Sequence, residues 1–314
     1  MRPRYAIMDR EQAPVALWPV KPPVPVRREI KRGMQLRYRV GLVGPPRRRV
    51  FVSLISPEEP DALALVVHGA GSYLGPYLPF AWELAGRGVV AALVDLPGHG
   101  LSDGAPAHIR SYTDYLEAID AALAWARETC PAAGTFLVGE SYGATLALLY
   151  TLDRARPREA LRGVVLSAPA FRPAGVPSWA LRAVRGLARA LPHLRLPRGP
   201  AVAVTRNPLA EEIVRRDPLL GRRLSASYVA ELVRAGEEAT RKAPLLDIPV
   251  LFLISGEDAV VDNSASRQAF SSLAVDDRTW QEFPGLAHAL LLEDPVGMAT
   301  AVSQWIHRRV HPRR

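Results

Sequence analysis

The pentapeptide Gly139-Glu140-Ser141-Tyr142-Gly143 places a serine between two glycines. It follows the apolar segment TFLVG and leads into the apolar segment ATLALLYTL, so a strand, a sharp turn and a helix are expected here. Glycines in such a turn let the backbone pass close to itself, and the serine hydroxyl then projects above the sheet near the helix N-terminus. We therefore predict that Ser141 is a nucleophile.

A serine hydroxyl reacts only when a base removes its proton and a third group orients that base. Asp258 follows the apolar segment PVLFLI, and His288 lies in PGLAHALLLED near the end of the chain. Serine, acid and histidine then occur in the order expected for a nucleophile on a strand-to-helix turn. Asp262 and Glu257 are rivals for the acid. We prefer Asp258 because it lies closest to the strand end after the turn residues Gly256 and Glu257.

The segment His68-Gly69-Ala70-Gly71 follows the apolar run LALVV, which reads as a buried strand. Glycines at this point allow the backbone to turn its N–H groups toward the charge that develops on a carbonyl oxygen during attack. The main-chain N–H of Ala70 and that of Tyr142, the residue after the nucleophile, are the predicted oxyanion hole.

Metal and redox chemistry are not expected. His68 and His99 lie in glycine-flanked loops, and without a third ligand at metal spacing we interpret both as structural hydrogen-bond donors. Cys130 is the single cysteine, so it cannot form an internal disulfide or supply a cysteine-based metal site. We expect an inert thiol, which fits a reducing compartment. No metal, nucleotide or redox cofactor is predicted.

The net charge of +9 is concentrated near the N-terminus of the 314-residue chain. Residues 1–50 contain 13 Lys and Arg against three acidic residues, and the remainder contains 27 against 28. A nucleic-acid enzyme normally carries basic side chains around its reacting site, with aromatic residues between them. This pattern is not visible, so no nucleic-acid partner is expected.

The hydrophobic pattern predicts an α/β protein. The segments MQLRYRVGLV and RRRVFVSLI alternate apolar and polar residues on either side of Gly44-Pro45-Pro46, which indicates an antiparallel pair of strands. Continuous apolar runs then alternate with amphipathic stretches such as YTDYLEAIDAALAWARETC. This arrangement is typical of a mostly parallel sheet that is covered by helices on both faces. The runs are LALVVHG, VVAALVD, TFLVG, GVVLSAP and PVLFLISG.

Changes in composition divide the chain into three parts. Residues 1–25 are rich in proline and predict an extended arm. Residues 26–170 and 244–314 contain the strand and helix pattern of the core. Residues 171–243 are much longer than a crossover requires and predict a helical cap over one edge of the sheet.

One cap segment, SWALRAVRGLARALPHL, has an amphipathic pattern. Its apolar face holds Leu181, Val184, Leu187 and Leu191, and its polar face holds Arg182, Arg185 and Arg189. We favour a helix packed on the domain below with a solvated arginine face. A transient contact of this helix with a membrane surface is the alternative. The chain shows neither an apolar run near 18 residues nor an apolar signal-peptide core, so a cytoplasmic location is expected.

The motifs HGAG, DLPGHGLSDG, GESYG, SGEDAVVD and GLAHALLLED resemble, in order and spacing, the monoacylglycerol lipases and lysophospholipases of the α/β-hydrolase superfamily, a serine aminopeptidase-type family. The cap segments LPHLRL, TRNPL and RRDPLL add to this likeness, which spans about residues 33–308. The resemblance implies an α/β-hydrolase fold, Ser141 as nucleophile, His288 as base and Asp258 as acid. It departs at Glu140 and Tyr142, where such lipases usually have His and Met.

These observations predict a serine hydrolase that cleaves carboxylic esters through an acyl-enzyme, with a monoacylglycerol or lysophospholipid-type ester as substrate. A proline iminopeptidase-type aminopeptidase is an alternative within the same fold. It needs an acidic anchor for the substrate amine, and the cap offers Glu211, Glu212, Glu231, Glu237 and Glu238. A non-catalytic binding or scaffold protein on the same fold is the alternative of another class. Chain length of the acyl group and oligomeric state are not determined by these patterns.

Overall fold

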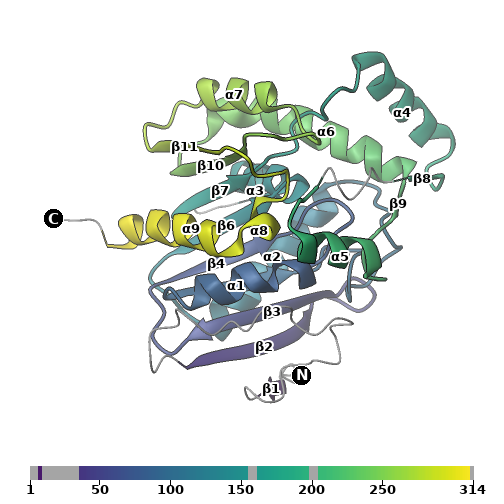
Figure 1. The fold of residues 1–314 in the computed structure, drawn as a ribbon. Helices are drawn as coiled ribbons and strands as arrows, with labels where there is room; N and C mark the ends of the chain where they lie inside the picture. Colours follow the sequence, from purple (N-terminus) through teal and green to yellow (C-terminus); the bar gives the residue numbers. More distant parts are fainter. Residues whose placement is uncertain (1–5, 9–34, 155–160, 198–203, 312–314) are drawn as a thin grey trace.

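The computed structural model describes residues 6–8, 35–154, 161–197 and 204–311 (Figure 1). Most of the predicted arm lies outside these residues. Within it, Ala6–Met8 form a short strand, β1, which pairs antiparallel with β2 at the edge of the sheet. The start of the predicted core at residues 26–34 also lies outside the described residues.

The centre of the fold is a nine-stranded sheet with the strand order β1-β2-β3-β5-β4-β6-β7-β10-β11. Strands from β5 to β11 in this order run parallel to one another, whereas β1, β2 and β3 are joined by antiparallel pairing. The sheet strands after β1 are β2 (Leu36–Val43), β3 (Val50–Pro57), β4 (Ala62–Val67), β5 (Val89–Val94), β6 (Thr135–Glu140), β7 (Gly163–Ser167), β10 (Val250–Ser255) and β11 (Arg278–Phe283). The mostly parallel α/β sheet predicted from the sequence is confirmed.

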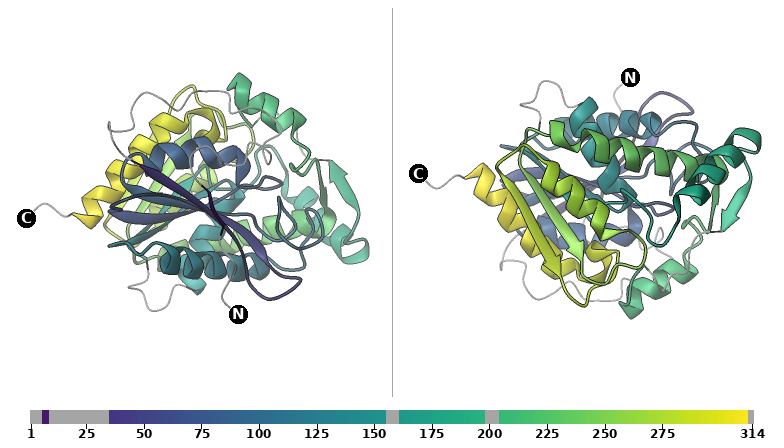
Figure 2. Two further views of the ribbon diagram at one scale, coloured as in Figure 1. Left: turned by 90° about the horizontal axis from the view of Figure 1, so that it is seen from below. Right: turned by 90° about the horizontal axis from the view of Figure 1, so that it is seen from above.

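Helices cover both faces of this sheet, as the two views of Figure 2 show. The helices α1, α8 and α9 pack on one face, and α2, α3, α7 and part of α6 pack on the other. Their bounds are α1 (Leu78–Ala85), α2 (Thr113–Thr129), α3 (Tyr142–Asp153), α6 (Ala226–Lys242), α7 (Asn263–Ser272), α8 (Leu290–Glu293) and α9 (Pro295–Val310), with a 3-10 turn, η2 (Gly75–Tyr77), before α1.

Alternation along each strand explains why the central strands are apolar throughout. In β4, Leu63 and Leu65 belong to the core on the α2 and α3 side, whereas Ala64 and Val66 belong to the core on the α1 and α9 side. Successive side chains of a strand point to opposite faces, so a sheet covered on both faces needs apolar residues at every position. The uninterrupted runs seen in the sequence therefore correspond to buried strands.

The predicted antiparallel pair at the start of the core is confirmed by β2 and β3. The connecting turn contains Gly44 with a φ of 102°, in the left-handed region that favours glycine. The N–H of Arg48 donates a 3.0 Å hydrogen bond to the carbonyl of Pro45 and closes this turn. The pair extends the parallel sheet with an antiparallel edge.

The segment between β7 and β10, called here the inserted segment, contains α4 (Ser178–Ala190), β8 (Arg195–Pro197), α5 (Pro208–Arg216), β9 (Arg223–Ser225), α6 and the 3-10 turn η5 (Ala243–Leu245). Strands β8 and β9 form a separate two-stranded sheet. In Figure 1, α4, α5, β8 and β9 lie at the right, and α6 runs from there across the upper part of the molecule toward α7. The C-terminal half of α6 belongs to the helical layer on the main sheet, because Ala235 and Ala239 are part of the buried core.

Helix α4 forms where the amphipathic pattern predicts it and packs against α6. Its apolar side chains Leu181, Val184 and Leu187 are only half-buried. The expectation for Leu191 is wrong: the helix ends at Ala190, and Leu191 follows it with 54% of its surface exposed. Arg185 also departs from the expected solvated face, since it forms an ion pair with Glu237 of α6. Within the described residues, no helix combines the length and apolar character needed to cross a bilayer.

Candidate active site

Ser141 lies at the sharp turn between β6 and α3 and adopts a strained backbone conformation, with φ 56° and ψ −119°. The flanking glycines are required by close backbone approach. A Cβ added to Gly139 would lie 2.3 Å from the carbonyl oxygen of Gly143, and one added to Gly143 would lie 2.1 Å from that of Val67. The turn predicted from the pentapeptide is therefore present, and only glycine fits at these two positions.

The structure brings Ser141, His288 and Asp258 into one hydrogen-bonded chain. The Oγ atom of Ser141 lies 2.8 Å from Nε2 of His288, and Nδ1 of His288 lies 2.8 Å from Oδ2 of Asp258. An ionised carboxylate can only accept hydrogen bonds, so Nδ1 of His288 must donate. In the neutral imidazole, Nε2 is then free of a proton and accepts the hydrogen bond of the serine hydroxyl.

Burial and backbone hydrogen bonds hold the carboxylate of Asp258 in place. The side chain of Asp258 is fully buried and that of His288 is 4% exposed. The second carboxylate oxygen, Oδ1 of Asp258, accepts hydrogen bonds from the N–H groups of Val260 at 2.8 Å and Val261 at 2.9 Å. Each oxygen of Asp258 therefore has its own partner, and the carboxylate cannot rotate away from the imidazole without losing these bonds.

The two rival acids make other contacts. Asp262 caps helix α7 through the N–H of Ser264 at 2.8 Å and pairs with Arg172. Hydrogen bonding to Ser264 and the Arg172 guanidinium lower the pKa of Asp262. Glu257 pairs with Arg206 at 2.6 Å. The structure thus brings only Asp258 of these three carboxylates into hydrogen-bond contact with His288.

The loop after β4 lies directly beside Ser141. A Cβ added to Gly69 would lie 3.2 Å from Cβ of Ser141, so the backbone of the loop approaches the serine closely. Ala70 follows and is half-buried. Tyr142 is the first residue of α3, where N–H groups have no acceptor within the helix. Both predicted oxyanion donors therefore lie on backbone that borders Ser141.

Glu140 is fully buried next to Ser141, and its surroundings could not be read from the sequence. Its Oε1 atom accepts hydrogen bonds from the N–H of Leu291 at 2.8 Å and from Oγ of Ser167 at 3.3 Å. Burial raises the pKa of Glu140 to about 7, and the Leu291 bond and the nearby His288 oppose this increase. Glu140 thereby links β6 to the segment that follows His288.

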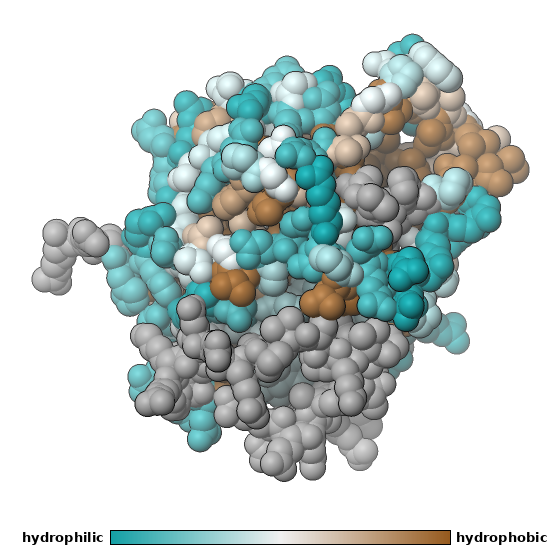
Figure 3. All heavy atoms as spheres, viewed as in Figure 1, coloured by the Kyte–Doolittle hydropathy of each residue, from teal (hydrophilic) through white to brown (hydrophobic). Residues whose placement is uncertain are grey.

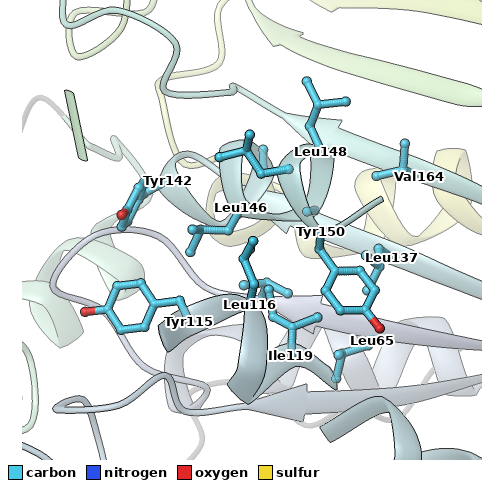
Figure 4. Packing of buried hydrophobic residues seen from close by; sticks show 14 of the residues in the cluster. Leu65, Tyr115, Leu116, Ile119, Leu137, Tyr142, Leu146, Leu148, Tyr150 and Val164 are labelled. Carbon is cyan, nitrogen blue, oxygen red and sulfur yellow. The ribbon is translucent and has the colours of Figure 1, made fainter. Parts of the chain in front are cut away.

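The side chain of Tyr142 points into the protein core. It is fully buried, and its ring makes edge contacts with Tyr115 of α2 at 6.1 Å and with Tyr228 of α6 at 5.9 Å between centroids. Figure 4 shows Tyr142 and Tyr115 near each other among the core residues. Burial raises the pKa of the Tyr142 hydroxyl well above its usual range. The side chain thus helps to anchor the turn that carries Ser141.

The two loop histidines make main-chain hydrogen bonds, as predicted. Nε2 of His68 accepts from the N–H of Leu96 at 3.0 Å, and Nδ1 lies 2.9 Å from the carbonyl of Gly69. Nδ1 of His99 lies 3.0 Å from the carbonyl of Pro97. Across the part of the chain that the structure describes, no three His, Cys, Asp or Glu side chains group in a way that could hold a metal ion.

Sequence reasoning missed a set of contacts from the inserted segment to the loop after β4. The hydroxyl of Tyr73 donates to Oδ2 of Asp217 at 2.5 Å, and Gly71 is hydrogen bonded to Gly221 and to Tyr228. The motif RRDPLL marked the neighbourhood of Asp217 in the sequence. No spacing rule connects it to Tyr73, which lies 144 residues earlier in the chain.

Comparison with known sequences places this site in a family. Residues 58–295 match the serine aminopeptidase S33 family. Phospholipase YtpA of Bacillus subtilis is 31% identical over 242 residues, which cover 75% of this chain and 91% of the phospholipase. The monoglyceride lipase of Homo sapiens is 26% identical over 260 residues, which cover 80% of this chain and 84% of the lipase.

Solved structures of lipases are also similar to this chain. A monoacylglycerol lipase from Paleococcus ferrophilus superimposes with a TM-score of 0.72 at 28% identity, covering 82% of this chain and 98% of that one. A soluble variant of the Saccharomyces cerevisiae monoglyceride lipase, at 16% identity and a TM-score of 0.74, has the same fold and covers 91% of this chain and 100% of that one. The chain therefore belongs to the serine aminopeptidase S33 family of α/β-hydrolases and is a monoacylglycerol lipase-like serine ester hydrolase.

Proposed function

We propose that Ser141, His288 and Asp258 are the catalytic triad of this ester hydrolase. The observation that carries the proposal is the pair of 2.8 Å hydrogen bonds that joins the three side chains. In the first step, Oγ of Ser141 attacks the ester carbonyl carbon while Nε2 of His288 takes the hydroxyl proton. Asp258 stabilises the imidazolium that forms and keeps its orientation.

The attack moves an electron pair onto the carbonyl oxygen, and the N–H groups of Ala70 and Tyr142 donate hydrogen bonds to it. His288 then gives its proton to the leaving alkoxide, and the alcohol departs from an acyl-Ser141 ester. A water molecule next loses a proton to His288 and attacks this ester. Collapse of the second intermediate releases the carboxylic acid and returns the proton to Ser141.

A single-chain lipid ester, of the monoacylglycerol or lysophospholipid type, is the proposed substrate class. Support comes from relatives that are named monoglyceride lipase and phospholipase. The mostly neutral body of the chain after residue 50, with 27 basic and 28 acidic residues, also suits a substrate bound largely through its apolar part.

A panel of steady-state rates tests the proposal. The substrates are p-nitrophenyl esters from acetate to palmitate, a monoacylglycerol, a lysophospholipid and a prolyl anilide, each repeated with Ser141→Ala. Turnover of medium or long acyl esters that disappears in the variant is expected, with an unchanged circular dichroism spectrum. Near-normal rates in Ser141→Ala would overturn the assignment. Covalent labelling of Ser141 by a fluorophosphonate separates the enzyme from a non-catalytic scaffold, which would stay unlabelled.

The aminopeptidase alternative requires an acidic side chain that can bind a free amine. Four of the five candidate glutamates form ion pairs with neighbouring cations: Glu212 with Arg216, Glu231 with Arg234, Glu237 with Arg185, and Glu238 with Arg241. A substrate amine would have to displace a guanidinium at each of these positions. This favours the ester substrate over the amine.

A transient membrane contact through the inserted segment is a further part of the proposal. Trp179, Leu191 and Leu194 are 67%, 54% and 42% exposed, and Figure 3 shows apolar residues gathered at the upper right, where Figure 1 draws α4 and β8. Exposed large apolar side chains beside arginines suit the surface of an anionic membrane. Cosedimentation with phosphatidylglycerol vesicles should decrease in Trp179→Ser, and equal binding of this variant would contradict the contact. A cytoplasmic location stays a prediction from the sequence alone.

A further inference from the structure

The loop after β4 is held by hydrogen bonds from two different parts of the fold. On the core side, the N–H of Gly69 donates to the hydroxyl of Tyr77 at 3.1 Å, and the N–H of Leu74 donates to Oδ1 of Asp95 at 2.7 Å. Tyr77 is fully buried in the α1 side of the core, and Asp95 follows β5. Both ends of the loop are therefore attached to the sheet and its helices.

The middle of the loop is attached instead to the inserted segment. The N–H of Gly71 donates to the hydroxyl of Tyr228 at 3.3 Å, and the carbonyl of Gly71 accepts from the N–H of Gly221 at 2.8 Å. A Cβ added to Gly221 would lie 3.3 Å from Cα of Gly71, so the two backbones are in direct contact. Both polar main-chain groups of Gly71 thus depend on the position of the inserted segment.

A third contact joins the same two parts through side chains. The hydroxyl of Tyr73 donates to Oδ2 of Asp217 at 2.5 Å, and Oδ1 of Asp217 accepts from the N–H of Leu219 at 2.8 Å. Tyr73 is 4% exposed and Asp217 is 3% exposed. Because both side chains are buried, little water can compete for the hydrogen bond between Tyr73 and Asp217. Burial and the neighbouring carboxylate raise the pKa of Tyr73, so its hydroxyl stays protonated and donates.

These contacts bracket the N–H group of Ala70. That N–H belongs to the peptide plane between Gly69 and Ala70, and Tyr77 fixes the plane before it while Tyr228 fixes the plane after it. A peptide plane between two fixed neighbours has little freedom to rotate about its own axis. The direction of the Ala70 N–H, and hence its hydrogen bond to an oxyanion, then depends on a contact from each side.

We propose that Tyr73, Asp217 and Tyr228 are positioning residues that hold the loop after β4 so that the N–H of Ala70 points at the oxyanion. The inserted segment then helps to build the catalytic site. This inference rests on the proposed function, because it takes Ala70 as an oxyanion donor. The positioned hydrogen bond forms with the charged oxygen of the transition state. Loss of positioning should therefore lower kcat and leave KM nearly unchanged.

The variants that test this are Tyr73→Phe, Asp217→Asn, Asp217→Ala and Tyr228→Phe. Removal of a whole oxyanion donor costs about 10² to 10³ in kcat, so a loosened donor should cost about 10-fold. Asp217→Asn keeps an acceptor oxygen for Tyr73 and should retain more activity than Asp217→Ala. Ser141 adds to the carbonyl carbon of a trifluoromethyl ketone, and the carbonyl oxygen becomes an oxyanion. The affinity for such a ketone should decrease in parallel with kcat.

Tyr150→Phe is the matched control. The Tyr150 hydroxyl donates to Oδ1 of Asp120 at 2.8 Å, a tyrosine-to-aspartate hydrogen bond like that of Tyr73. This bond joins α3 to α2 and does not involve the loop after β4. The expected result is that Tyr73→Phe and Tyr228→Phe lose kcat and inhibitor affinity, whereas Tyr150→Phe loses neither at a similar melting temperature. Equal kcat and inhibitor affinity in all three variants would overturn the inference, as would a change confined to KM. Ester turnover that persists in Ser141→Ala would instead remove the proposed function beneath it.

Discussion

Nδ1 of His288 lies 2.8 Å from Oδ2 of Asp258, although the two residues are 30 positions apart and belong to loops after different strands. The strands β10 and β11 that carry them are parallel neighbours, so their carboxyl ends meet at one edge of the sheet. The contact fixes which nitrogen of the imidazole carries the proton. It also leaves Nε2 directed at Ser141, 2.8 Å away.

Replacement of Asp258 by Asn should reduce kcat for ester hydrolysis by about 10³ to 10⁴-fold with little change in KM. The amide keeps the shape of the side chain, but its NH₂ group can face Nδ1 of His288 and favour the wrong tautomer. Steady-state kinetics on a p-nitrophenyl ester measures the effect. Asp262→Asn is the control, because Asp262 contacts Ser264 and Arg172 and should leave kcat unchanged. A larger loss in Asp262→Asn than in Asp258→Asn would reverse the assignment of the acid.

Glu140 predicts a pH dependence of stability. Burial raises its pKa from 4.5 to about 7, so its ionised form is disfavoured in the folded state. The stability contributed by the neutral form is complete below pH 4.5 and is lost as the pH rises through about 7. Glu140→Gln stays neutral at every pH. Its free energy of unfolding, relative to that of the wild type, should therefore increase by on the order of 3 kcal/mol between about pH 4 and pH 8. The increase falls between the two pKa values, at about 1.4 kcal/mol per pH unit.

Urea unfolding of both proteins at each pH measures this difference. Asp95, whose pKa burial also raises to about 7, is present in both proteins and cancels from the comparison. A difference in the free energy of unfolding that does not change with pH would mean that Glu140 titrates alike in the folded and unfolded chain.

Gly143→Ala should destabilise the protein by more than about 4 kcal/mol or prevent folding, because its Cβ would lie 2.1 Å from the carbonyl oxygen of Val67 and 2.6 Å from that of His68. Neither backbone oxygen can move without breaking up the end of β4. Gly186→Ala is the opposite case, since nothing lies within 4 Å of its Cβ and the residue is inside α4. It should stabilise the protein by about 0.5–1 kcal/mol. Similar melting temperatures for the two variants would count against this account of the turn at Ser141.

Glu231→Gln tests the aminopeptidase alternative. Glu231 accepts from the N–H of Tyr112 at 2.9 Å and pairs with Arg234 at 2.6 Å. Glutamine keeps an acceptor for Tyr112 and removes only the charge, which in a partly exposed pair is worth about 0–1 kcal/mol. Ester turnover should therefore stay unchanged. A selective increase in KM for prolyl anilide, with ester kinetics unaffected, would support an amine-binding role instead.

Short stretches of the sequence were enough to predict the strand and helix around Ser141 and the kind of chemistry to expect there. The two glycines lie within the five residues of the turn, and the strand and helix adjoin it directly. All of them are local features of the chain. The order of serine, acid and histidine could likewise be read along the chain. Parallel strands bring their carboxyl ends to one edge of the sheet. The proximity of these three side chains could therefore be predicted without knowing the strand order.

Which side chains meet across the fold depends on how distant segments pack together, and the sequence patterns did not give this. The choice of Asp258 over Asp262 depends on where a loop points, and the sequence ranked these acids by position alone. Helix periodicity placed Leu191 on the apolar face, but the helix ends one residue earlier and leaves it exposed. Periodicity describes a helix while it continues and does not fix where it stops.

The burial of Glu140 and the contact between Tyr73 and Asp217 also had no local signal. A carboxyl is normally exposed, and its burial is tolerated here because Leu291 and Ser167 supply hydrogen bonds from distant segments. Tyr73 and Asp217 come together because the inserted segment folds back onto the loop after β4. Such contacts depend on packing of the whole chain, whereas sequence patterns report the properties of one element at a time.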